Sequence, residues 1–134
     1  MKKNKGFTLV ELMAVIVILA IIITIAVPSA ITISHRIRLK MYNTKVTMLL
    51  DSAKLYGQDQ PGKVVSSEGS CPSNGNVTVQ NLIDAGYVKK DDQDNGKVID
   101  PVDNSEMNTY KICIYKKNNR VYAKTIGTNW NKHD

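Results

Sequence analysis

The chain has 134 residues and a modest positive charge, with 18 basic and 12 acidic side chains. Three lysines precede Gly6, so a chain that began at the next residue would carry a net charge of about +3 in place of +6. That excess is too small to indicate nucleic acid as the main partner. After a membrane-length apolar segment, about 100 residues remain to fold in water, which is room for one small domain.

An apolar run from Phe7 to Val27 follows the lysines and contains one charged residue, Glu11. As an α-helix, its 21 residues would be about 32 Å long, close to the roughly 30 Å hydrocarbon core of a bilayer. The lysines favour a cytoplasmic N-terminus, with the rest of the chain outside. A cleaved secretory signal and a plain uncleaved anchor are alternatives. However, a signal peptide has a shorter apolar region, and a carboxylate inside such a segment is costly and usually marks a function.

The sequence KGFTLVELMAVIVILAIIITIAVP, residues 5–28, resembles the N-terminus of type IV prepilins and the related pseudopilins. It has a short basic leader that ends in Gly6, an aromatic residue at Phe7, a glutamate five positions after the glycine, and Pro28 near the end of the apolar run. The resemblance covers about 25 residues and points to a class of filament subunits, not to one member.

This resemblance implies how the segment is processed and used. In the family a membrane aspartyl protease, the prepilin peptidase, cuts after the glycine, here Gly6, and N-methylates the new terminal residue, here Phe7. The methylated amine remains a cation. Glu11 would pair with the amine of the neighbouring subunit, because two buried opposite charges are tolerated together and each alone is costly. Glu11 would therefore set the register between subunits.

The helix is expected to continue well beyond the apolar run. After Pro28 the chain has no glycine before Gly57, and Pro61 gives the first clear stop. We therefore expect one helix over Phe7–Tyr56. Pro28 removes one backbone hydrogen bond and should bend or loosen this helix locally, which would also let it stretch in a fibre.

The second half of this helix carries two apolar stripes. The first stripe has spacings of four and three: Tyr42, Val46, Leu49, Ala53 and Tyr56. The second lies more than about 90° away on a helical projection: Ile37, Met41, Met48 and Leu55. We assign the first stripe to the chain's own head and the second to neighbouring subunits. The alternative is one wide face buried in a single core.

The C-terminal region contains a short helix and a hairpin. In TVQNLIDAGYV, Thr78 is a good N-cap and Gly86 suits a helix C-terminus. TYKICIYKKNNRVYAKTI is typical of a hairpin whose Asn118 and Asn119 take positive φ values in a tight turn. In that register one face is apolar and should pack on the long helix: Ile112, Ile114, Val121 and Ala123. Tyr115 and Tyr122 should lie opposite one another on the other face.

The two cysteines, Cys71 and Cys113, have neither CxxC spacing nor a histidine cluster nearby, which argues against zinc and favours a disulfide in an exported chain. The hairpin register places Cys113 on the outer face of the sheet, so the bond would tie residues 65–76 over that face. A loop of this size stabilises a domain by roughly 3 to 4 kcal/mol. Two unpaired thiols are the alternative.

The run DDQDNGKVIDPVD partly resembles a calcium loop, but Val102 stands at the twelfth position, where a bidentate glutamate would be needed. Some major pseudopilins bind calcium in a C-terminal loop after a dipeptide like Asp100 and Pro101. The aromatic residue and glycine that usually follow are replaced here by Val102 and Asp103. We expect a solvated turn and no metal. The residues that would be calcium candidates are Asp91, Asp94, Asp100 and Asp103.

These features predict an α+β fold, with a long N-terminal α-helix packed against a small antiparallel β-sheet head. The expected organisation has four parts: a leader at 1–6, a transmembrane and polymerisation helix at 7–28, its amphipathic continuation at 29–60, and an α+β head at 61–134. We expect Gly6, Phe7, Glu11 and Pro28 to serve processing and assembly.

We expect a structural subunit of an extracellular type IV pilus and not an enzyme, because the sequence shows no nucleophile with a plausible base and no phosphate-binding glycine loop. It would use no cofactor. Its partners would be copies of itself, prepilin peptidase, the pilus assembly platform with its ATPase, and the cytoplasmic (inner) membrane before assembly on the cell surface. The alternatives are a pseudopilin of a type II secretion or DNA-uptake fibre, and a minor tip subunit that binds DNA or a surface ligand. The exposed cations available for DNA would be Lys89, Lys90, Lys116, Lys117 and Arg120.

Overall fold

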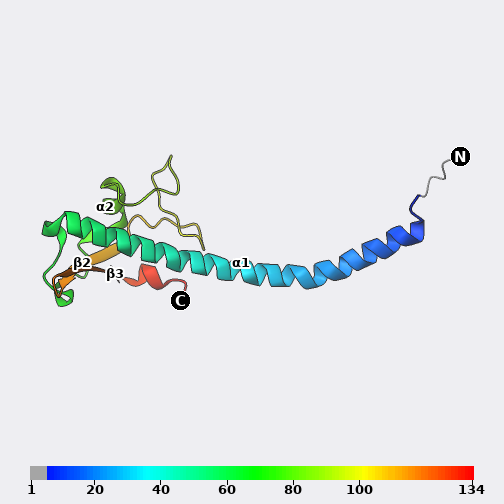
Figure 1. Ribbon diagram of the computed structural model, residues 1–134, viewed down its shortest axis with the longest axis horizontal. Helices are drawn as coiled ribbons and strands as arrows, with labels where there is room; N and C mark the ends of the chain where they lie inside the picture. Colours follow the sequence, from blue (N-terminus) through cyan, green and yellow to red (C-terminus); the bar gives the residue numbers. More distant parts are fainter. Residues whose placement is uncertain (1–5) are drawn as a thin grey trace. The chain divides into compact units, whose positions relative to one another are not determined.

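The computed structural model describes residues 6–134, so the leader expected at 1–6 lies outside the described residues apart from Gly6. The chain divides into two compact units between Ile37 and Arg38. Helix α1 (Leu9–Asp59) contributes to both units, and the sheet and the remaining helices belong to the second (Figure 1). The fold class is α+β, as the sequence predicts.

Helix α1 is slightly displaced from the predicted range of Phe7–Tyr56, since it begins at Leu9 and ends at Asp59. Gly57 lies inside the helix and is buried. A β-carbon at this position would lie 2.6 Å from the Ile114 side chain. The glycine therefore permits a close approach of helix and sheet and does not end the helix.

In the first unit, α1 continues through Pro28. Proline donates no N–H to the carbonyl of the preceding turn. Around it the hydroxyls of Thr24, Ser29 and Thr32 donate to main-chain carbonyls three or four residues earlier, at 2.7, 3.4 and 3.2 Å. These polar side chains are satisfied within the helix, so they can enter an apolar environment without an unpaired donor.

From Ile37 onward, α1 buries the first apolar stripe and exposes the second. Val46 is half-buried, and four other residues of the first stripe are buried: Tyr42, Leu49, Ala53 and Tyr56. The assignment of this stripe to the chain's own head is confirmed. The second stripe is 53 to 63% exposed: Ile37, Met41, Met48 and Leu55. Its assignment to neighbouring subunits stays a prediction.

The sheet has three antiparallel strands in the order β1-β2-β3: β1 (Val77–Thr78), β2 (Lys111–Lys117) and β3 (Arg120–Ile126). Strands β2 and β3 form the predicted hairpin, and Asn118 and Asn119 take φ values of +50° and +63° in its turn. Strand β1 was not predicted. Its two residues, Val77 and Thr78, pair with Ile112 and Lys111 at the start of β2.

The hairpin register is the predicted one. Ile114 pairs with Ala123, and Tyr115 pairs with Tyr122. The two tyrosine rings stack on the outer face with centroids 5.8 Å apart. Cys113 also lies on that face, but it is fully buried because it forms a disulfide with Cys71. The disulfide thus covers part of the outer face of β2, as expected.

The predicted short helix is α2 (Val79–Asp84). Its N-cap is Thr78, which forms a reciprocal capping box with Asn81. Gly86 has a φ of +83° just beyond its end, a conformation that favours glycine. Three 3-10 helices complete the second unit: η1 (Pro61–Lys63), η2 (Glu68–Ser70) and η3 (Thr128–Asn131).

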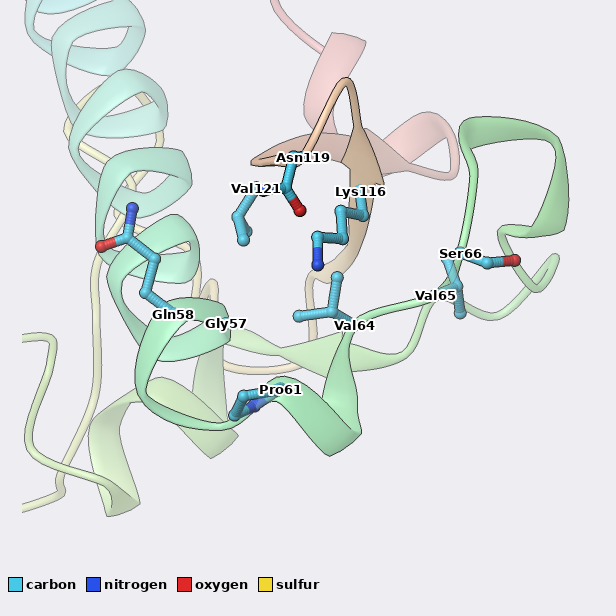
Figure 2. A pocket seen from close by; sticks show the side chains of 9 residues that line it. All are labelled: Gly57, Gln58, Pro61, Val64, Val65, Ser66, Lys116, Asn119 and Val121. Carbon is cyan, nitrogen blue, oxygen red and sulfur yellow. The ribbon is translucent and has the colours of Figure 1, made fainter.

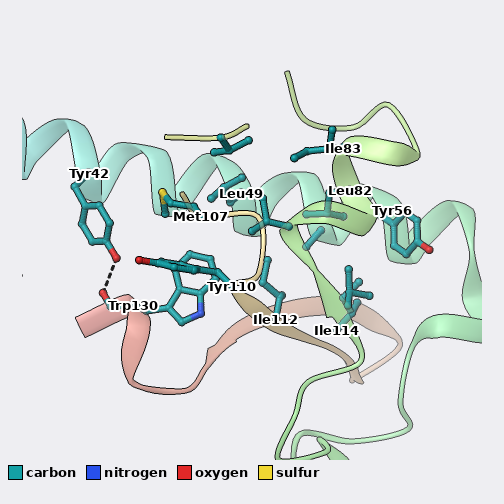
Figure 3. Close-up of a cluster of buried hydrophobic side chains, with 14 residues drawn as sticks. Tyr42, Leu49, Tyr56, Leu82, Ile83, Met107, Tyr110, Ile112, Ile114 and Trp130 are labelled. Atoms are coloured by element: carbon teal, nitrogen blue, oxygen red, sulfur yellow. Dashed lines mark hydrogen bonds between the residues drawn. The ribbon is translucent and has the colours of Figure 1, made fainter. Parts of the chain in front are cut away.

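The core lies between the C-terminal half of α1 and the inner face of the sheet (Figure 3). Its fully buried side chains include Leu82, Met107, Ile112 and Ile114. Trp130, from η3, closes one end of this core: its indole N–H donates to the carbonyl of Lys111 at 2.9 Å. The C-terminal segment is therefore part of the packed head.

Candidate processing and assembly site

The proposed cleavage bond lies just before the first turn of α1. Gly6 and Phe7 are outside the helix, and Phe7 is 89% exposed. Among the described residues, apart from Gly6 itself and its chain neighbours, no heavy atom lies within 4 Å of the position that a β-carbon on Gly6 would take. Because a protease needs an accessible, non-helical bond, this placement suits cleavage between these two residues.

Thr8 and Glu11 form a capping box at the start of α1. The main-chain N–H of Thr8 donates to the Glu11 carboxylate at 3.2 Å, and the N–H of Glu11 donates to the Thr8 hydroxyl at 3.2 Å. Two N–H groups that the helix itself cannot satisfy are thereby paired. The carboxylate also lies at the positive end of the helix dipole. Glu11 is therefore held at the helix start by its own chain.

Sequence reasoning missed the role of Thr8. The signal was present, because residues 8–11 read TLVE, which fits the S/T-x-x-E pattern of a capping box. The resemblance to prepilins implies a role for Glu11 toward another subunit, whereas these bonds are local to its own helix. The two roles are compatible, since the capping bond uses one carboxylate oxygen, Oε2.

Glu11 has no cationic partner within residues 6–134, where no lysine, arginine or histidine lies within ion-pair distance of its carboxylate. In an apolar medium this carboxylate would be costly alone. A cation from outside the described residues would lower that cost.

Helix α1 is long and apolar enough to cross a membrane. Every residue from 6 to 38 is exposed, including the large apolar side chains of the first unit. Such a surface is not stable in water and requires lipid or other apolar helices around it. This segment therefore suits a membrane-anchored precursor.

The calcium candidates of the head do not converge on one site. The Asp91 carboxylate pairs with the Lys45 ammonium and accepts the N–H of Ile99 at 2.7 Å. The described residues contain one cluster with spacing suitable for a metal, and it joins Asp100 and Asp103 to His133. Neither Asp91 nor Asp94 belongs to it.

This cluster already contains a cation. The Lys132 ammonium lies 3.0 Å from Asp100 Oδ2 and 2.8 Å from Asp103 Oδ2. The hydrogen bonds from Lys132 and Ser105 hold the pKa of Asp103 well below its usual range. Burial acts to lower the pKa of Lys132, but its bonds to Asp103, Tyr110 and Asp100 outweigh burial and raise it. The residues present therefore do not fit a calcium ion.

Asp100 is charged although its side chain is fully buried. Burial acts to raise its pKa, but hydrogen bonds from the Val102 N–H, His133 and Lys132 outweigh burial and lower the pKa. The Val102 N–H lies 2.8 Å from Oδ1, and His133 Nε2 lies 2.8 Å from Oδ2. Each oxygen of this buried carboxylate is thus hydrogen-bonded.

A shallow pocket of about 430 Å³ lies between the end of α1 and the hairpin (Figure 2). Gly57, Val64 and Val121 give it apolar walls, and Lys116 and Asn119 supply polar groups. Its nine lining residues include no acid, histidine or cysteine. They therefore supply no acid–base pair.

Comparisons with known proteins concern the N-terminal segment. Residues 1–27 match the family model described as the prokaryotic N-terminal methylation motif. Neither the curated proteins nor the solved structures gave a significant match to the chain. The matched segment contains Gly6, Phe7 and Glu11, and it is a signal of the type IV pilin and pseudopilin class.

Proposed function

We propose that this chain, with its type IV pilin-like signal, is the precursor of a structural subunit of an extracellular type IV pilus. The observation that carries the proposal is the methylation motif over residues 1–27. In this proposal, prepilin peptidase cuts after Gly6 and methylates the amine of Phe7. The exposed bond before α1 and the exposed apolar surface of the first unit support it.

The proposed assembly step joins the apolar helices of successive subunits. Glu11 receives the Phe7 amine of a neighbouring subunit, while its capping bonds to Thr8 hold the carboxylate in place. The pair is favourable because each charge alone would be buried without a partner. The exposed second stripe, which includes Met41, Met48 and Leu55, would contact other subunits.

In this proposal, four ranges of the chain have separate functions. Residues 1–6 are the leader, 7–28 cross the membrane and later polymerise, 29–60 extend that helix, and 61–134 form the head. The precursor is anchored in the cytoplasmic membrane, where the assembly platform and its ATPase extract it. A pseudopilin of a secretion or DNA-uptake fibre would have the same N-terminal steps and would differ in what its fibre moves.

Co-expression with a prepilin peptidase tests the processing step. The purified product is expected to begin at Phe7 and to carry one added methyl group, which mass spectrometry of the intact chain and of its N-terminal peptide detects. Gly6→Val should leave the full-length precursor. Gly62→Val is the matched control, because Gly62 also has open space around its β-position. A product that begins elsewhere, or an unmethylated Phe7, would overturn this step.

Fractionation of cells tests the assembly step. The processed chain should be found in filaments sheared from the cell surface and labelled along their length by antibodies to the head. Labelling confined to filament tips would support the minor-subunit alternative. A processed chain that remains entirely in the membrane in cells that make pili would overturn the proposal of a pilus subunit.

A further inference from the structure

The loop that contains Asp100 and Asp103 is closed by a lysine from the other end of the head sequence. The Lys132 ammonium lies 3.0 Å from Asp100 Oδ2 and 2.8 Å from Asp103 Oδ2, and its third oxygen partner is the Ser105 hydroxyl. The ammonium also lies over the Tyr110 ring, 5.7 Å from its centroid. Carboxylate oxygens, such as those of Asp100 and Asp103, are among the ligands that a divalent cation of the calcium type prefers.

The chain places this lysine with several independent contacts. Two residues earlier, the buried Trp130 donates its indole N–H to Lys111 and accepts the Tyr42 hydroxyl on its main-chain carbonyl, at 2.9 and 2.8 Å (Figure 3). One residue later, His133 contacts the same Asp100 oxygen at 2.8 Å. The C-terminal segment is therefore fixed on both sides of Lys132, and little backbone freedom remains to be lost when the ammonium binds.

A divalent ion could not share the site with this ammonium. Calcium binds oxygen at about 2.3 to 2.6 Å, so an ion held by both carboxylates would lie within a few ångströms of the Lys132 nitrogen, and the two cations would repel. The ion would have to displace Lys132, and with it part of the contacts of the C-terminal segment. The buried Asp100 needs one cation, and the chain provides it.

We propose that Lys132 is the permanent cation of the Asp100–Asp103 loop and replaces a divalent metal there. The loop and the C-terminal segment are then joined without calcium, and the head keeps its fold when metal is removed. The oxygen atoms of this loop are nevertheless of the kind that binds cations. Without the ammonium, the two carboxylates and the Ser105 hydroxyl would accept calcium.

Thermal unfolding of the full chain in dodecyl maltoside tests this proposal, with Trp130 as the probe because it is the single tryptophan, is buried, and lies two residues before Lys132. The parent is expected to have the same Tm in EDTA as in about 5 mM calcium, a concentration above the roughly 10⁻³ M dissociation constants of the weakest extracellular calcium modules. A calcium-dependent rise in the Tm of the parent would overturn the proposal.

Two variants test the role of the ammonium. Lys132→Met should lower the Tm in EDTA by at least about 10 °C, because a buried carboxylate loses its cation, and calcium should restore part of this loss. Lys124→Met is the matched control: it removes a half-buried lysine that pairs with Glu68 at 3.5 Å, and it should change the Tm little with or without calcium. A Lys132→Met chain that melts like the parent, or that calcium does not stabilise, would contradict the proposal. If Lys132→Met fails to fold, calcium titration of the parent still decides the question, since saturable binding at the loop contradicts the proposal and its absence supports it.

Discussion

Thr8 and Glu11 hold one another at the first turn of α1 through two reciprocal bonds of 3.2 Å. This places the only carboxylate of the apolar segment where the helix dipole stabilises it. An incoming amine would therefore meet a carboxylate whose position is already set by its own helix. The assembly pair proposed for Glu11 therefore depends on Thr8 as well.

The first prediction concerns Thr8. Thr8→Val removes the hydroxyl acceptor and keeps the shape of the side chain, which should cost about 1 kcal/mol at the helix start. If that cost falls on assembly, about fivefold less subunit should be found in sheared filaments. Thr8→Ser keeps the hydroxyl and should assemble like the parent. Equal amounts of Thr8→Val and parent in filaments would show that the capping box does not position Glu11.

The second prediction concerns Glu11 itself. Glu11→Ala should insert into the membrane and be cut after Gly6 as well as the parent, because an ionisable group has been removed from an apolar helix. Assembly should fail, since breaking one side of a buried pair costs about 3 to 5 kcal/mol, or two to three and a half decades in an association constant. The measurement is the ratio of subunit in sheared filaments to subunit in membranes. If processed Glu11→Ala assembles at parental levels and no other subunit supplies a carboxylate, the pairing mechanism is wrong.

Local signals made much of the fold predictable. The turn at Asn118 and Asn119 follows from two residues that tolerate positive φ between alternating strands, and the burial of Leu49 and Tyr56 follows from helical spacing. Strand β1 was missed because two residues show no period, and Thr78 also serves as the N-cap of α2.

The contacts of the head that depend on distant residues could not be predicted in this way. Nothing in the run of acids around Asp100 indicates which cation it will meet, because Lys132 lies far along the chain and is brought to it by tertiary packing. A sequence pattern can show that a loop offers carboxylates. Only the fold shows that the chain has already filled the site.

The third prediction concerns the disulfide. Replacing both Cys71 and Cys113 by serine should lower the free energy of unfolding by roughly 4 kcal/mol, because the bond closes a loop with a sequence separation of 42 residues. Urea unfolding of the full chain in detergent, followed by Trp130 fluorescence, measures this loss. Chemical reduction of the parent should have a similar effect and should leave the serine variant unchanged. If the parent and the variant unfold at the same urea concentration, the disulfide contributes nothing to the stability of the head.

The last prediction concerns Tyr42, which joins α1 to the C-terminal segment. Its hydroxyl donates to the main-chain carbonyl of Trp130 at 2.8 Å, and Tyr42→Phe leaves this buried acceptor unpaired at a cost of about 1 to 3 kcal/mol near neutral pH. Burial, with the nearby Tyr110 and Asp100, raises the pKa of Tyr42 to about 12. In the unfolded chain the pKa of a tyrosine is about 10.

A pKa that is higher in the folded state means that the stability from Tyr42 is fully present below about pH 10 and is lost as the pH rises to about 12. The parent should therefore lose stability more steeply than Tyr42→Phe over this window, and the difference between their free energies of unfolding should shrink. Urea unfolding measures the difference in the free energy of unfolding between the parent and Tyr42→Phe at about pH 8 and at about pH 11.5. Most of the titration of Tyr42 falls between these two pH values. Tyr122→Phe is the control for the loss of a tyrosine hydroxyl as such, because that ring lies on the outer face of the hairpin. A Tyr42→Phe difference that stays constant across this window would show that the hydroxyl titrates no differently in the folded and unfolded chains.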